Sequence, residues 1–77
     1  MTMVTVRFFA AARAAAGTTE TSLDAASLTE LREFLGEKYG PELTRVLSIS
    51  SYLVDGTRDG DLRDGAVVDV LPPFAGG

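Results

Sequence analysis

The sequence has 77 residues, 45% of them hydrophobic, and it contains neither cysteine nor histidine. The length predicts one small domain, and the missing residue types exclude a disulfide framework, a thiolate metal site, a cysteine nucleophile and the commonest general base. Seven basic against eleven acidic residues give a net charge of −4, which argues against binding of nucleic acid because phosphate neutralisation dominates that affinity.

The apolar stretch from Val4 to Ala16 resembles a signal peptide only superficially. Arg7 and Arg13 interrupt it, and no basic segment precedes it. We interpret it as a strand followed by a short helix. Since no run approaches the roughly 20 apolar residues of a membrane span, the expectation is a cytoplasmic protein without a membrane partner.

The first half of the chain carries three predicted elements. Val4, Val6 and Phe8 alternate with polar residues, the period of a half-buried strand. Residues 10–16 are rich in alanine and predict a short helix that a glycine ends. Residues 18–23 contain three threonines and predict a return strand with little apolar content.

The clearest local signal follows at residues 27–30. Ser27 and Glu30 have the spacing of a capping box, in which each side chain bonds a backbone N–H of the other end. The helix that begins there places its large apolar residues on one face, which we expect to be buried: Leu28, Leu31, Phe34, Leu35 and Tyr39. Pro41 and residues 42–47 predict a further helical turn.

The second half of the chain predicts two more strands. Tyr52 to Val54 forms the first, which the turn dipeptide after it closes. Residues 57–65 are polar and predict a loop. Its aspartates lack the closing glutamate of a calcium loop, so we expect a solvated loop and no metal site. Val67 to Leu71 is an almost continuous apolar run, typical of a central strand, and the prolines after it cannot extend a ladder.

This order of elements predicts an α+β protein with the ubiquitin-like β-grasp fold. One amphipathic helix packs across a mixed sheet, in which the first and last strands are central, parallel neighbours. The whole chain, residues 1–77, forms a single domain in this interpretation, with residues 72–77 as an extended C-terminal tail.

The tail suggests how a chain without a catalytic side chain can take part in chemistry. Pro72 and Pro73 favour a stiff, extended start, and six extended residues reach about 20 Å. Gly76 and Gly77 have no side chains, so they can enter a channel too narrow for a Cβ atom. We therefore predict that Gly77, through its terminal carboxylate, is the reacting residue, and that Gly76 provides steric clearance.

Three stretches resemble the MoaD/ThiS family of bacterial sulfur carriers. They are residues 8–10 with Arg13 and Gly17, the Asp64-Gly65 turn before the last strand, and residues 71–77. The resemblance spans nearly the whole chain. Its Pro-Pro pair before the tail is more similar to the molybdopterin synthase branch than to the thiamine branch.

The resemblance implies a function for the tail. An ATP-using enzyme of the ubiquitin-activating type adenylates the Gly77 carboxylate, and sulfur then replaces one oxygen to give a thiocarboxylate. The tail inserts into the large subunit of molybdopterin synthase and donates sulfur for the molybdenum cofactor. The chain is then no enzyme on its own. It is the sulfur-donating small subunit of a sulfurtransferase complex, and it binds no cofactor, because the activating partner uses the ATP.

The residues predicted to bind a partner lie at both ends of the chain. Phe74 is the aromatic anchor of the tail. Phe8 and Phe9 point to opposite faces, so one of them is expected in an exposed apolar patch. The full set is Pro72, Pro73, Phe74, Ala75 and Gly76 in the tail, with Phe9 and Arg13 near the N-terminus.

Alternative functions remain at this point. A sulfur carrier of this kind can also serve thiamine or cysteine biosynthesis. A ubiquitin-like protein modifier shares the tail and forms isopeptide bonds through Gly77. A plain β-grasp interaction domain would carry the two terminal glycines by chance.

Overall fold

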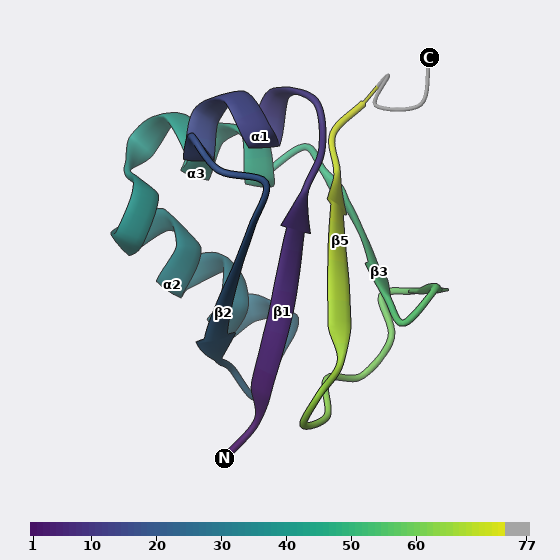
Figure 1. The fold of residues 1–77 in the computed structure, drawn as a ribbon. Helices are drawn as coiled ribbons and strands as arrows, with labels where there is room; N and C mark the ends of the chain where they lie inside the picture. Colours follow the sequence, from purple (N-terminus) through teal and green to yellow (C-terminus); the bar gives the residue numbers. More distant parts are fainter. Residues whose placement is uncertain (74–77) are drawn as a thin grey trace.

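The computed structural model describes residues 1–73 (Figure 1). Each of the first two strands is followed by a helix, a third helix comes next, and three strands follow. In chain order the elements are β1 (Met3–Phe8), α1 (Ala11–Ala16), β2 (Glu20–Asp24), α2 (Leu28–Tyr39), α3 (Pro41–Leu47), β3 (Ser51–Val54), β4 (Thr57–Arg58) and β5 (Val67–Leu71).

The strands form one mixed sheet in the order β2-β1-β5-β3-β4. β1 and β5 are parallel neighbours, with Val6 opposite Val68, and the other pairs are antiparallel. α2 and α3 lie against one face of this sheet (Figure 1). The predicted β-grasp order, with the first and last strands central and parallel, is therefore confirmed.

The core lies between the sheet and these helices. Alternate residues of β1 and β5 point inward, as their period of two predicts. Val6, Val68 and Val70 have no exposed surface at all. They pack against leucines of both helices, which are likewise buried: Leu31, Leu35, Leu43 and Leu47.

The predicted cap of α2 is present. Ser27 is the N-cap residue, and its hydroxyl oxygen accepts a hydrogen bond from the Glu30 N–H at 3.2 Å. The Glu30 carboxylate reaches back to the N–H of Ala26, at 3.4 Å. The first bond satisfies a backbone donor that the first helical turn leaves without a partner. The second ties the residue before the cap to the helix, and together the two bonds fix where α2 begins.

The prediction that Phe34 is a core residue is wrong. Its exposed fraction is 40%, whereas Leu31 and Leu35 have none. Successive residues of a helix are rotated by about 100°, so Phe34 lies beside the stripe that these two leucines occupy. The stripe faces the sheet, and Phe34 lies at its margin on the same side as Lys38, one turn later.

The polar segment after β3 is only partly a loop. Thr57 and Arg58 form β4, paired antiparallel with Val54 and Leu53. The prediction missed this strand because two exposed residues carry no periodic signal. Within residues 1–73, none of the helices is long and apolar enough to cross a membrane.

Candidate functional site

The C-terminal tail starts from the centre of the sheet. β5 is held by β1 on one side and by β3 on the other, and Leu71, opposite Ser51, is its last paired residue. Pro72 is buried and Pro73 is exposed. Because neither proline has an N–H to donate, the ladder ends here as predicted. The tail therefore leaves a strand that is fixed on both sides.

Four residues with predicted roles lie outside the described residues. They are Phe74, Ala75, Gly76 and Gly77. The reacting role of Gly77 and the partner-binding role of the others stay predictions.

The sheet face opposite the helices adjoins the start of the tail. It carries the residues that alternate with the core along each strand; those of β3 and β5 are half-buried, whereas Arg7 on β1 is exposed. Leu53, Val67 and Leu71 supply aliphatic surface. Arg7 and Asp69 lie among them, opposite each other across the β1–β5 ladder. We call this surface the open face.

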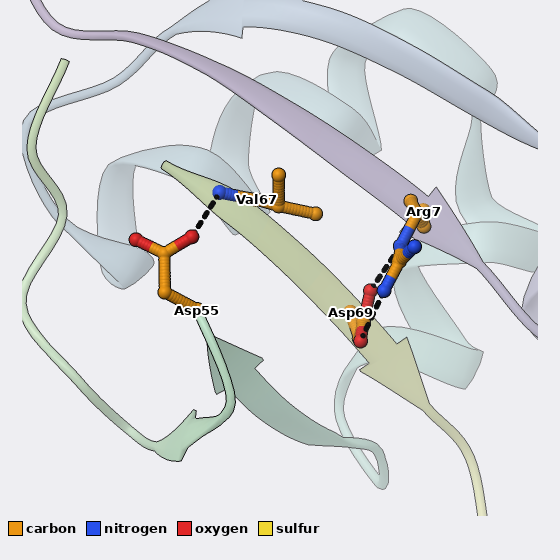
Figure 2. Close-up of polar contacts among 4 residues, drawn as sticks. All are labelled: Arg7, Asp55, Val67 and Asp69. Atoms are coloured by element: carbon orange, nitrogen blue, oxygen red, sulfur yellow. Dashed lines mark hydrogen bonds and ion pairs between the residues drawn. The ribbon is translucent and has the colours of Figure 1, made fainter. Parts of the chain in front are cut away.

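Arg7 and Asp69 form an ion pair in the middle of the open face (Figure 2). The Arg7 Nε and Nη2 atoms donate to the two carboxylate oxygens, at 2.6 and 2.9 Å. The hydrogen bond to Asp69, reinforced by its charge, raises the pKa of Arg7. Two parallel bonds fix both side chains, so the open face presents an ordered ion pair with aliphatic side chains toward β3 and Glu20 opposite Arg7 on β2.

Phe9 adjoins this pair at the end of the sheet where the tail starts. Its ring is half-buried, and the Arg7 guanidinium carbon lies 5.9 Å from the ring centroid, within cation–π range. Phe8 points the other way into the core, where its ring meets Tyr39 edge-on at 5.7 Å. Because β1 and β5 are parallel, Phe9 directly after β1 and Pro72 directly after β5 lie at the same end of the strands.

α1 lies at that same end of the sheet (Figure 1). Arg13 lies on it with an exposed side chain. The structure thus brings the residues that bear predicted partner contacts, Phe9, Arg13, Pro72 and Pro73, to one end of the molecule. Whether they contact a partner stays a prediction, but their placement around the start of the tail is compatible with it.

Ala10 makes the turn from β1 into α1 in a strained conformation. Its φ of 50° and ψ of −124° lie where glycine is comfortable and other residues are rare. Strain of this kind persists only where the surroundings hold it in place. Here it aims α1 across the end of the sheet, beside the start of the tail.

Sequence reasoning missed the ion pair and the bracing of β5. Asp69 is the one charge in its strand, a signal that could have suggested a cross-strand partner. At the other end of β5, the Asp55 carboxylate accepts the Val67 N–H at 2.9 Å, and the Asp55 N–H donates to the Val67 carbonyl at 2.8 Å (Figure 2). These bonds hold the first residue of the strand that leads to the tail.

The described part of the chain offers surfaces for binding. Across residues 1–73, no group of three or more histidine, cysteine, aspartate or glutamate residues could hold a metal ion. The aspartates of the polar loop, Asp59, Asp61 and Asp64, are exposed, and Asp64 accepts the N–H of Met3 at 2.9 Å. An open cavity of about 390 Å³ between α2 and α3 is lined by Arg32, Glu33, Thr44, Leu47 and Ser48.

Comparisons with known proteins agree on family and fold. The model of the ThiS family matches residues 6–77. A chain in the complex of subunits 1 and 2 of molybdopterin-converting factor from Helicobacter pylori is 32% identical, with 97% of this chain and 99% of that chain covered and a TM-score of 0.71. Small archaeal modifier protein 1 from Methanosarcina acetivorans is 28% identical, with 100% and 98% covered and a TM-score of 0.84. The comparison with curated proteins gave no match.

Proposed function

Because this chain belongs to the ThiS family of sulfur carriers and ubiquitin-like proteins, we propose that it carries sulfur as a thiocarboxylate on Gly77 for molybdopterin biosynthesis. The observation that carries this proposal is the extent of the family match, which continues to Gly77. The match thus includes both terminal glycines, not only the folded body.

The proposed reaction begins with activation of the terminal carboxylate. A carboxylate is a poor electrophile, so a partner of the ubiquitin-activating type joins it to AMP and releases pyrophosphate from ATP. A sulfide-equivalent nucleophile, supplied by a sulfur-donating partner, then attacks the acyl carbon; the new C–S bond forms, the C–O bond to AMP breaks, AMP leaves with that electron pair, and a thiocarboxylate remains. ATP belongs to the partner, and this chain binds no cofactor. Both activated states need a pocket that excludes water, because water would hydrolyse them.

The chain's own residues position the tail for that reaction. β5 is paired on both sides, and buried Pro72 fixes the point of departure. Two glycines at the end allow entry into a narrow channel. The folded body therefore provides the surface that a partner binds while the terminus reacts.

The proposed receiving partner is a large subunit of the molybdopterin synthase type. Support comes from the Helicobacter pylori structure, which is a complex of two subunits of molybdopterin-converting factor. On this chain the open face and the end of the sheet that carries Phe9 and Arg13 adjoin the start of the tail. A partner that receives the tail can cover both. We also propose a cytoplasmic location, where such partners would be met.

The test is removal of Gly77. The variant should keep the circular dichroism spectrum and stability of the parent, because a terminal residue contributes few buried contacts. ATP–pyrophosphate exchange with the cognate activating enzyme should vanish. A variant with one residue added after Gly77 should lose exchange as well, whereas Asp61→Asn, on the exposed loop, serves as a control that keeps it. Exchange at the parent rate by a folded variant without Gly77 would refute the proposal.

The similarity to small archaeal modifier protein 1 favours a second candidate, a ubiquitin-like modifier. The two functions share activation of Gly77 and differ in the product. Intact mass spectrometry of the protein from cells separates them. A carrier gains the mass difference between sulfur and oxygen, and a modifier appears joined to lysines of other proteins.

A further inference from the structure

The edge formed by β2 presents backbone groups without a strand partner. Within residues 1–73, β2 pairs only with β1 and is the first strand of the sheet (Figure 1). The Thr5 N–H donates to the carbonyl of Ala66, the residue before β5, and the Phe8 N–H donates to the carbonyl of Thr19, the residue before β2. Alternate residues of a strand bond to opposite sides, so Glu20, Ser22 and Asp24 direct their N–H and C=O groups away from the sheet. Of these, the Glu20 carbonyl accepts the Thr18 hydroxyl, at 3.2 Å.

An exposed aromatic side chain lies beside this edge. The Lys38 ammonium reaches from α2 to the Thr21 hydroxyl at 3.0 Å, which places that face of α2 over β2. Phe34 lies one turn earlier on the same face, about 6 Å along the helix. The chain enters α2 from the Asp24 end of β2 and reaches Thr21 only at Lys38, so Phe34, one turn before Lys38, lies toward half-buried Leu23. A strand added at the edge would thus have apolar contacts on its helix side.

The charges at the edge select what can add to it. Glu20 and Asp24 are acidic and point to the open-face side, on either side of Ser22. If a second copy paired antiparallel over all five residues, Glu20 would face Asp24 twice, and like charges directly opposite each other destabilise a sheet. The same two carboxylates would favour a strand with basic residues on either side of its central residue.

We propose that β2 is a docking edge for an extended segment of a partner protein. The segment adds a strand to the sheet, places basic side chains opposite Glu20 and Asp24, and places apolar side chains between them toward Leu23 and Phe34. Main-chain hydrogen bonds supply the attachment, and the alternating side chains supply the selection. This site does not depend on Gly77 or on the sulfur-carrier function.

The experiment uses the full chain, labelled with nitrogen-15, and a capped synthetic peptide of sequence Thr-Lys-Leu-Thr-Leu-Lys-Thr. This sequence reads the same in both directions, so either strand orientation presents the same side chains. The peptide should shift the amide signals of Glu20, Ser22 and Asp24 and slow their hydrogen exchange. A matched peptide with glutamate for lysine should bind roughly tenfold more weakly or not at all.

Variants separate edge pairing from general attraction. Ser22→Pro removes an outward N–H, which an edge strand tolerates, and should abolish the shifts while circular dichroism stays unchanged. Glu20→Lys should weaken binding of the lysine peptide. Phe34→Ala should also weaken its binding, without a change in the charge of the protein. Asp61→Lys changes the net charge equally but lies in the exposed loop after β4, beside the start of α2 and outside β2, and it should have no effect.

Three outcomes would overturn the proposal. Equal affinity for the lysine and glutamate peptides would remove the role of the acidic residues. Shifts confined to the open face would assign the peptide to another surface. Signals of β2 that depend on protein concentration without any peptide would assign the edge to a second copy of this chain.

Discussion

The pairing of Arg7 with Asp69 leads to a quantitative prediction about partner binding. The Arg7 side chain is 49% exposed and that of Asp69 is 17% exposed, so water still reaches the pair in the free protein, mainly at Arg7. A partner that covers the open face would remove the remaining water. If only one charge were left there, it would be buried without its counter-charge, which is far more costly than burial of the pair.

We therefore predict a strong coupling between two substitutions that remove the charges. Arg7→Met alone and Asp69→Leu alone should each weaken binding of a large-subunit-type partner by roughly thirtyfold or more. The double variant should bind within about threefold of the parent, since an apolar pair of similar volume often replaces a buried ion pair without loss. The free energy of unfolding of the double variant should change little, because both charges of this partly buried pair are removed together.

Isothermal titration calorimetry on the four proteins gives this double-mutant cycle. Glu42→Gln, an exposed acidic residue on α3, is the control and should leave the affinity unchanged. The parent complex should also depend only weakly on salt, because the charges of Arg7 and Asp69 neutralise each other and other exposed charges are screened within about 10 Å at 0.1 M salt. If the losses of the single variants simply multiply in the double variant, the partner does not bury this pair and our assignment of the open face is wrong.

Three further predictions concern the folded body. Leu35→Ala should lower the free energy of unfolding by about 2–5 kcal/mol in urea denaturation, and Phe34→Ala by less than about 2 kcal/mol; equal losses would contradict the exposure of Phe34. Burial raises the pKa of Tyr52 to about 12, while its hydroxyl donates to the Leu47 carbonyl at 2.6 Å. The stabilisation from neutral Tyr52 is therefore complete below pH ~10, the pKa of the unfolded chain, and is lost as pH approaches 12. The parent should lose about 2–3 kcal/mol over that range and Tyr52→Phe distinctly less; identical pH profiles would rule this out. Ala10→Gly should stabilise by about 1 kcal/mol in the same assay, because it relieves the strained φ, and a loss of stability would show that the turn is not strained.

The sequence by itself determined the elements that have a regular hydrophobic period. β1, β5 and α2 are each long enough for their buried residues to recur at two or about 3.6 positions, so the pattern marks both the type of element and its inward face. Turn and cap residues have local causes as well, which is why the cap at Ser27 and the end of β5 at Pro72 were predictable. The terminal glycines and the family resemblance likewise need no structure.

Only the tertiary structure decided which of these surfaces are covered and which residues meet. The pairing of Arg7 with Asp69 joins residues 62 positions apart, and it depends on β1 and β5 being parallel neighbours in one register. The exposure of Phe34 depends on how much of α2 the sheet can cover, and the open edge of β2 depends on the strand order. A local pattern records how each element is buried, but contacts between elements are set by the packing of the whole sheet. The sequence therefore leads to the prediction that Gly77 reacts, whereas the surfaces of the folded body required the fold.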